Sequence, residues 1–309
     1  METHEIKVFG HRSPDTDATA SAMVWSWFLN THRGQKSTPY VLGNINTEAN
    51  FVLESWGLTT PAVLDEVHAQ DMVAIVDTNN LDELFENINE TTIISIIDHH
   101  KLSGNLKTNI PLELVIQPYA STMTVMYNVM NIEPKDFPRE IAGLMLSGIV
   151  SDTLEFRSPT TTNEDKVLAE QLARVLDINI SEYAKKMFEA KSDISEFSAN
   201  ELLHMDSKIF DIKGKNIRIS VLETTNPSLV LERYNEIVNT IPDIVEKEDI
   251  ENILLFVIDI LKEEAVVFIQ NNEVKIILEN AFNILITDNT FILPGIVSRK
   301  KQILPALLK

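Results

Sequence analysis

Short apolar runs alternate with helical patterns from the start of the chain to about residue 118. A continuous apolar run of strand length is typical of a parallel sheet with both faces covered, because side chains on each face are then buried. The runs expected to form strands are Ile6–Phe9, Pro39–Leu42, Met72–Val76, Thr92–Ile97 and Leu112–Ile116, and the clearest helices are Ala18–Thr31 and Glu48–Trp56. The pattern predicts an α/β domain with a doubly wound, mostly parallel sheet.

Helical spacing then dominates from Ser121 to about Ser207 and includes the apolar run Ile141–Val150. These helices complete the first domain, which we expect to cover residues 1–190. The polar stretch at residues 191–196 is the best candidate for a linker, although its helical spacing also fits a connecting helix. The second domain is then expected to cover residues 197–309.

The pattern changes in this second domain. Strand-like runs surround one clear helix, Pro227–Thr240, and Asn271 and Asn272 between two of the runs indicate a hairpin turn. The runs expected to form strands are Ile217–Leu222, Ile253–Ile258, Ala265–Ile269 and Val274–Leu278. We therefore predict a smaller α/β domain with a mixed sheet that contains antiparallel pairs.

Composition narrows the possible functions. The chain has 309 residues, 44% of them apolar, which fits two globular domains. It contains no cysteine, so thiolate metal sites and thiol catalysis are excluded and His, Asp and Glu remain as side-chain metal ligands. No apolar run is long enough for a membrane span, which favours a cytoplasmic protein. The net charge of −20 disfavours a nucleic-acid partner, because Lys and Arg bind phosphate backbones.

Potential metal ligands follow three predicted strands of the first domain. In open α/β sheets the carboxyl ends of the strands form the edge where ligands bind, so we expect these side chains to lie close together. A single Asp at a strand end is usually a turn or helix-cap residue, but three such ends, two of them with His, favour a metal site. The residues are His11, Asp15 and Asp17 after the first strand, Asp77 after the third, and Asp98, His99 and His100 after the fourth.

A further carboxylate, Asp152, follows the apolar helical run Gly143–Val150. A carboxylate at the end of a buried helix must be paired, hydrogen-bonded or metal-bound, because an unpaired buried charge is costly. The alternative is contact with solvent, but a negative charge is unfavourable at the carboxyl end of the helix dipole. Metal binding would relieve that conflict.

Taken together, the order and spacing of these residues resemble the DHH phosphoesterase superfamily. The resemblance lies in the His-x-x-x-Asp-x-Asp loop at residues 11–17, Asp77, the triplet at residues 98–100 and Ser-Asp-Thr at residues 151–153. Near the C-terminus, residues 298–302 resemble the signature of the second domain, DHHA2, of manganese-dependent (family II) inorganic pyrophosphatases. The resemblance covers nearly the whole chain.

The resemblance implies an active site between the two domains, with two divalent ions. The implied ligands of one ion are His11, Asp15 and Asp77, and those of the other are Asp17, Asp77, His99 and Asp152, so that Asp77 bridges the ions. The implied catalytic and substrate-binding residues are Asp77, Asp98, which orients the site, His100, which faces the substrate, and the phosphate-binding cations Lys208, Arg299 and Lys300. The chain differs from the family at Thr78 and Asn80, where His and Glu are usual.

The implied activity is hydrolysis of inorganic pyrophosphate to two phosphates by a metal-activated water. The resemblance also implies Mn²⁺ or Co²⁺ in the protein sites, Mg²⁺ arriving with the substrate, and a homodimer. The nearest alternative is an exopolyphosphatase of the same architecture. A DHH-type nuclease or nucleotide phosphoesterase conflicts with the net charge of −20, and a catalytically inactive binding protein with this fold is the fourth possibility.

Overall fold

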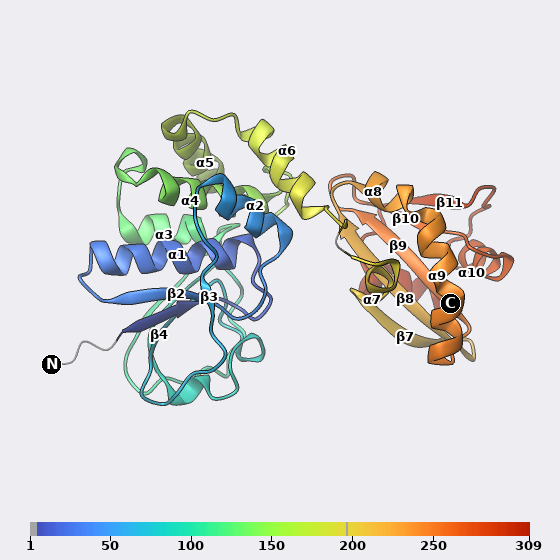
Figure 1. The fold of residues 1–309 in the computed structure, drawn as a ribbon, viewed down its shortest axis with the longest axis horizontal. Coiled ribbons are helices and arrows are strands. Elements are labelled where there is room, and N and C mark those ends of the chain that lie inside the picture. The colour runs from blue at the N-terminus through green and yellow to red at the C-terminus, as the bar shows by residue number, and fades with distance from the viewer. Residues whose placement is uncertain (1–4, 196) are drawn as a thin grey trace. The chain divides into compact units, whose positions relative to one another are not determined.

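The computed structural model describes residues 5–195 and 197–309. The chain divides into two compact units, Met1–Ala190 and Lys191–Lys309, and Figure 1 labels the helices and strands of each. None of the helices in the described residues is long and apolar enough to cross a membrane.

The first unit is built on a six-stranded sheet in the order β3-β2-β1-β4-β5-β6, with all neighbouring strands parallel. The predicted doubly wound parallel sheet is confirmed. Its strands are β1 Ile6–Phe9, β2 Ser37–Val41, β3 Ala62–Val63, β4 Met72–Val76, β5 Thr92–Asp98 and β6 Glu113–Ile116. Only β3 was not expected, because it has two residues and both are exposed.

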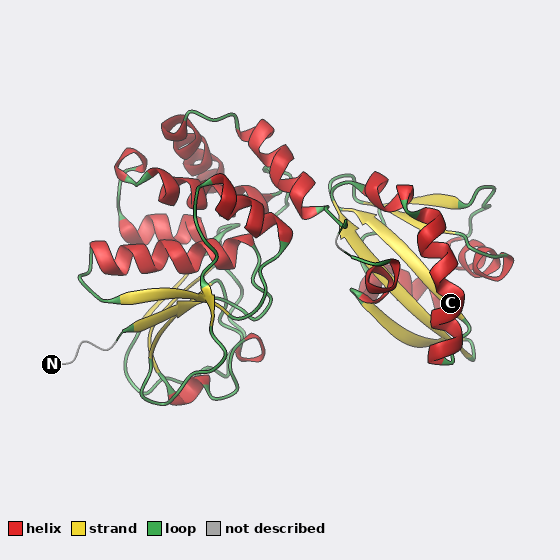
Figure 2. Cartoon of the chain, viewed as in Figure 1, coloured by secondary structure: helices red, strands yellow, loops and turns green. Residues whose placement is uncertain are grey.

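The long helices of this unit gather on one face of the sheet, as Figure 2 shows. Val8, Val76 and Ile97 point to that face and pack in one core with the helices. The helices are α1 Thr16–Thr31, α2 Thr47–Ser55, α3 Thr122–Met130, α4 Arg139–Thr153, α5 Asn163–Leu176 and α6 Ile180–Lys191, and a short helix, η3 Pro134–Asp136, precedes α4. On the other face, Phe9 and Ile75 pack against loops and the short helices η1 Leu81–Glu83 and η2 Ile88–Glu90.

The strand order reverses direction between β1 and β4. From β1 the chain builds β2 and β3 outward on one side, then returns to place β4, β5 and β6 on the other. Ligands of open α/β sheets bind outside the carboxyl ends of the strands at such a reversal. Gly10 follows β1, Asp77 follows β4 and Asp98 ends β5, so the three predicted strand ends lie along this edge.

The second unit holds a five-stranded mixed sheet in the order β11-β10-β9-β8-β7. Strands β8 and β9 are parallel and all other neighbours are antiparallel, which confirms the predicted mixed sheet. The strands are β7 Ser207–Ile212, β8 Lys215–Thr224, β9 Asn252–Asp259, β10 Glu264–Phe268 and β11 Thr290–Pro294. Neither β7 nor β11 was predicted, because both are edge strands with many exposed side chains and hence a weak apolar pattern.

Helices cover both faces of this second sheet. Leu255 and Val257 of β9 pack with α7 to α9, and Leu254 and Phe256 pack with α10 and α11. The helices are α7 Ala199–His204, α8 Pro227–Glu232, α9 Tyr234–Glu248, α10 Asn272–Phe282 and α11 Leu304–Leu307, and the π-helical turn η4 Arg299–Ile303 leads into α11. The single helix predicted at residues 227–240 is therefore two helices that meet at Arg233, and the second continues to Glu248.

The predicted strand at residues 274–278 and the predicted hairpin turn at Asn271–Asn272 are wrong. Asn271 is instead the N-cap of α10, and its side-chain oxygen accepts a hydrogen bond of 2.8 Å from the backbone N–H of Val274. Val274 and Leu278, four residues apart, are buried, whereas Ile276 is half-exposed, which is the period of a helix. The antiparallel neighbours of β10 are β9 and β11.

Candidate metal centre

The loop after β1 begins with a glycine that close packing requires. A Cβ atom at Gly10 would lie 2.9 Å from the Cβ of Ala18 and 3.2 Å from the carbonyl oxygen of Val76. Because Gly10 has no side chain, β1, β4 and the first turn of α1 can approach one another at this point. The next residue, His11, is thereby held at the edge of the sheet beside the end of β4.

Asp15 serves both as a helix cap and as a neighbour of His11. Its Oδ1 accepts a hydrogen bond of 2.9 Å from the backbone N–H of Ala18, which makes it the N-cap of α1. Its Oδ2 lies 3.7 Å from Nε2 of His11, and that nitrogen is 3.5 Å from Oδ2 of Asp77. The three side chains form a group with the spacing of metal ligands.

Asp77 lies at the centre of the cluster and has an unusual backbone conformation. Its φ of 56° lies in the left-handed region, which Asp tolerates better than most residues. The buried carboxylate accepts a hydrogen bond of 2.8 Å from the hydroxyl of Thr122, and its Oδ1 is 3.4 Å from Nε2 of His99. Asp77 therefore contacts both His11 and His99.

Asp17 is buried between two helices. Its Oδ1 accepts a hydrogen bond from the Ser121 hydroxyl and its Oδ2 one from the Thr122 backbone N–H, each 2.8 Å long, at the N-terminus of α3. Helix α4 presses against its other side, where a Cβ atom at Gly148 would lie 2.5 Å from Oδ1. Asp17, His99 and Asp152 form a second group with the spacing of metal ligands.

The ring of His99 has its orientation fixed by the backbone. Its Nδ1 lies 3.1 Å from the carbonyl oxygen of Tyr119, and because a carbonyl can only accept, Nδ1 carries the proton. Nε2 faces Asp77 and Asp152, whose Oδ2 is 3.7 Å away, and it offers a lone pair to a cation once it has lost its proton. This is the arrangement usual for a metal-bound imidazole.

Asp98 and His100 form a pair at the end of β5. Oδ1 of the buried Asp98 accepts hydrogen bonds from the backbone N–H groups of His99 and His100 and lies 2.9 Å from Nδ1 of His100. Its Oδ2 accepts a 2.6 Å bond from Asn79. The contact with Asp98 raises the pKa of His100, whose side chain is 52% exposed, so its charged ring can meet a ligand from solvent.

The electrostatics of the cluster fit divalent cations. Burial raises the pKa of Asp17 to about 7, with repulsion from Asp77 adding to it, and burial together with repulsion from Asp17 raises that of Asp152. In the described part of the chain, the ion-pair partners of Asp77 and Asp152 are histidines. Carboxylate oxygens and imidazole nitrogens suit Mn²⁺ and similar ions, which would neutralise these buried charges.

The histidines hold protons tightly in the free protein. Burial alone lowers the pKa of His11, but Asp15 and Asp77 outweigh burial and raise it to about 10. Burial also lowers the pKa of His99, but Asp77 and Asp17 outweigh burial and raise it to about 9. Burial alone raises the pKa of Asp77, but the contacts with His11 and His99 outweigh burial and lower the pKa of that carboxyl. Protons on the two rings therefore compete with a cation for the site.

All six predicted metal ligands thus meet at one place, and their role as ligands stays a prediction. Sequence reasoning missed the residues that hold them, chiefly Ser121, Thr122, Asn79 and Gly148. A signal for the first two was present, because they follow the end of β6 at the same edge of the sheet. The importance of Gly148 depends on the close packing of α4 against Asp17, which no local pattern reports.

The predicted phosphate-binding cations belong to the second unit. Lys208 is exposed on β7, and Lys300 is exposed in the turn η4. Arg299 donates hydrogen bonds of 2.7 Å to the backbone carbonyl and to the carboxylate of Asp206, two residues before Lys208. This unit therefore places Arg299 beside the beginning of the strand that carries Lys208.

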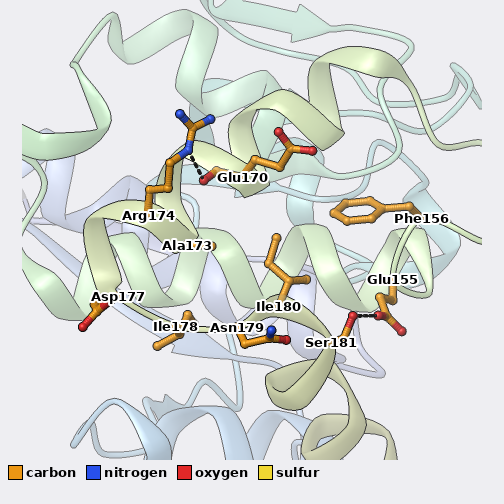
Figure 3. A pocket seen from close by; sticks show the side chains of 10 residues that line it. All are labelled: Glu155, Phe156, Glu170, Ala173, Arg174, Asp177, Ile178, Asn179, Ile180 and Ser181. Atoms are coloured by element: carbon orange, nitrogen blue, oxygen red, sulfur yellow. Dashed lines mark hydrogen bonds between the residues drawn. The ribbon is translucent and has the colours of Figure 1, made fainter.

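A wide groove of about 740 Å³ lies in the first unit, where the residues after α4 meet α5 and α6 (Figure 3). Glu155 accepts a hydrogen bond from Ser181 on its wall, and Nε of Arg174 donates to the Glu170 carbonyl. None of the predicted site residues lines it.

Comparison with known proteins gives a consistent result. The model of the DHH family, N-terminal domain, matches residues 5–149, and the model of the DHHA2 domain matches residues 185–309. Proteins named "Probable manganese-dependent inorganic pyrophosphatase" from Lactobacillus gasseri and Streptococcus mutans are 33% and 34% identical to this chain. The matches cover 97% and 98% of this chain and 96% and 97% of those relatives.

A solved structure agrees with these matches. The crystal structure of a candidate family II inorganic pyrophosphatase from Methanococcus jannaschii is 34% identical in sequence and superposes with a TM-score of 0.65. The match covers 98% of each chain.

Gly148→Ala should weaken cation binding without unfolding the protein. The new methyl group would lie 2.5 Å from Oδ1 of Asp17, so the carboxylate must move, whereas alanine favours the helix itself. We expect Mn²⁺ affinity, measured by isothermal titration calorimetry, to fall by roughly tenfold or more, as when a supporting residue of a metal site is removed. Glu140→Ala, at an exposed position of the same helix, is the control. Unchanged affinity in Gly148→Ala would contradict the packing described here.

Cation binding should release protons and strengthen as the pH rises. Because the pKa values of His11 and His99 are about 10 and about 9, both rings are protonated at neutral pH and must lose a proton to bind a metal. Calorimetry in two buffers of different ionisation heat should show release of at least about two protons per chain at pH 7.5, because the raised pKa values of Asp17 and Asp152 add to the protons from the two rings. The Mn²⁺ affinity should increase from pH 6 to 8.5. Binding without proton release would show that the rings are not ligands.

Proposed function

The chain belongs to the manganese-dependent inorganic pyrophosphatases, and we propose that it hydrolyses inorganic pyrophosphate to two phosphates at the metal centre described above. The observation that carries this proposal is the convergence of predicted ligands from β1, β4, β5 and α4 around the single carboxylate of Asp77. The full-length match to the named relatives supports the substrate.

Two divalent ions occupy the centre in this proposal, Mn²⁺ or Co²⁺ in the protein sites, with Mg²⁺ arriving with pyrophosphate. Ions of this kind lower the pKa of water and neutralise charge on the phosphoryl oxygens. We assign His11, Asp15 and Asp77 to the first site and Asp17, Asp77, His99 and Asp152 to the second. This assignment is supported by the close grouping of the first three residues and by that of Asp17, His99 and Asp152. Asp77 belongs to both sites because its two oxygens face different histidines.

Substrate binding requires further positive charge. The carboxylates Asp15, Asp17, Asp77 and Asp152 together carry as much negative charge as two divalent ions carry positive charge, so the loaded centre attracts an anion weakly. Lys208, Arg299 and Lys300 supply the missing cations and bind the phosphate oxygens. The guanidinium of Arg299 is already oriented by Asp206, which limits the entropy lost when it binds.

His100 assists departure of the product phosphate. Asp98 accepts the hydrogen bond from Nδ1, raises the pKa of the ring and holds its orientation, which leaves Nε2 as the proton-donating atom. A positioned imidazolium can protonate or stabilise a leaving phosphate. Asp98 thereby influences the reaction through His100. It also holds the backbone of the proposed ligand His99, whose N–H donates a hydrogen bond to its carboxylate.

Thr78 and Asn80 are compatible with this activity. The Thr78 hydroxyl donates a 2.6 Å hydrogen bond to Glu83, and Asn80 caps the short helix η1. Asn79 lies between them, and its side-chain amide donates a hydrogen bond to Asp98. Its side-chain oxygen, Oδ1, accepts hydrogen bonds from the backbone N–H and the hydroxyl of Ser103. The loop after Asp77 is thus ordered by a network of its own, which argues against an inactive binding protein.

We also propose a homodimer, a cytoplasmic location and no nucleic-acid partner, the last in keeping with the net charge of −20. Light scattering after size-exclusion chromatography measures the oligomeric state directly. Phosphate release from pyrophosphate, medium-length polyphosphate and a short oligonucleotide tests the activity. Pyrophosphate should be hydrolysed by far the fastest, and faster release from polyphosphate would assign the chain to the exopolyphosphatases instead.

Asp77→Asn and Lys300→Ala should separate metal binding from substrate binding. The first removes a charge shared by both ions, so metal content and kcat should fall together, the latter by at least about 100-fold. The second removes one charge-assisted contact and should raise KM by roughly 10- to 100-fold with metal content unchanged. Lys301→Ala is the matched control for the basic turn. Full metal occupancy in Asp77→Asn would overturn the assignment of a bridging carboxylate.

Asp98→Asn should shift the pH dependence of kcat. Removing the negative charge beside Nδ1 makes the charged ring less stable, so the pKa of His100 falls toward its ordinary value near 6.5. Activity that depends on protonated His100 is then lost at lower pH, so the alkaline limb of the profile should move to lower pH than in the wild type. His100→Gln should remove that limb, and a profile identical to wild type in both variants would exclude proton donation by His100.

A further inference from the structure

We propose that Glu48 is a positioning residue of the metal centre, a role that rests on the proposed metal site. Glu48 lies in the first turn of α2 and is 0% exposed. Its Oε2 accepts hydrogen bonds of 2.8 Å from the hydroxyl of Thr16 and 2.7 Å from the hydroxyl of Ser151. One carboxylate oxygen therefore joins the beginning of α1 to the last turn of α4.

The two hydroxyl residues are direct sequence neighbours of proposed ligands. Thr16 stands between Asp15 and Asp17, and Ser151 immediately precedes Asp152. The backbone at residue 16 therefore determines where two ligands point, and the backbone at residue 151 determines where a third points. By holding both hydroxyls, Glu48 fixes the relative position of two segments that are distant in the sequence.

The end of α4 needs such an anchor. The helix stops after Thr153, and Leu154, Glu155 and Phe156 all have φ between 48° and 68°, a conformation that costs energy in residues other than glycine. The last turn of the helix therefore adjoins a strained reversal, and the bond from Ser151 to Glu48 holds it in place. Asp152, in that turn, is kept facing Asp17 and His99.

A buried carboxylate in this position destabilises the metal-free protein, because a buried charge lowers stability. It has two advantages: it can only accept, so both hydroxyls must donate to it, and its charge shortens and strengthens both hydrogen bonds. The role therefore predicts opposite effects of Glu48→Gln, weaker cation binding and equal or greater stability of the metal-free protein.

The test uses the full-length protein and Mn²⁺ as the probe. For Glu48→Gln we expect Mn²⁺ affinity from calorimetry to fall by roughly tenfold, while the melting temperature of the metal-free protein stays equal or rises. Glu54→Gln, the same change at an exposed position of α2, should alter neither quantity. A residue with only a structural role would lower the melting temperature and leave affinity unchanged, and that result would overturn the proposal.

A double-mutant cycle with Ser151→Ala tests whether Glu48 affects Mn²⁺ affinity through the hydroxyl of Ser151. If Glu48 acts through that hydroxyl, Glu48→Gln should cost less affinity in the Ser151→Ala background than in the wild type, and additive losses would overturn this route. Ser151→Ala alone gives the same readout should Glu48→Gln fail to fold. A wild-type protein that binds Mn²⁺ but does not release phosphate from pyrophosphate would refute the proposed function, while the Mn²⁺ titration would still decide the role of Glu48.

Discussion

Repulsion among buried carboxylates is the constraint on which the first unit depends. Asp17, Asp77 and Asp152 are held together where burial and like charge both disfavour ionisation, and the raised pKa values of Asp17 and Asp152 record that cost. Hydroxyl and backbone donors at the start of α3 offset part of it, and the two histidines offset more. Such an arrangement favours cations because the polypeptide alone leaves its charge unbalanced.

The fold supplies the means to hold these groups. The reversal of strand order sets the ends of β1 and β4 side by side, and glycines at positions 10 and 148 let a helix approach each end of the cluster. The N-termini of α1 and α3 direct backbone N–H groups at the carboxylates of Asp15 and Asp17, a favourable place for negative charge. Packing, helix termini and topology thus act on the same few side chains.

Sequence patterns predicted five of the six strands of the first unit and the convergence of the six proposed ligands, because polar residues at buried strand ends stand out against apolar runs. They failed at Val274–Leu278, where a short run of β-branched residues fits either a strand or a helix and only the capping by Asn271 decides between them. They also gave no indication of Gly148 or Glu48, whose importance arises from contacts between helices far apart in the chain. Long-range packing is the information that a local pattern lacks.

The distribution of the cluster along the polypeptide has a consequence for biosynthesis. Its members span residues 11 to 152, and β1 must pair with β4 across the whole of α1, β2, α2 and β3 before His11 meets Asp77. Pairings of such sequence separation form slowly, since the intervening loop must be closed first. A nascent chain on the ribosome therefore lacks a complete cation site until α4 has emerged, so metal acquisition follows the folding of almost the entire first unit.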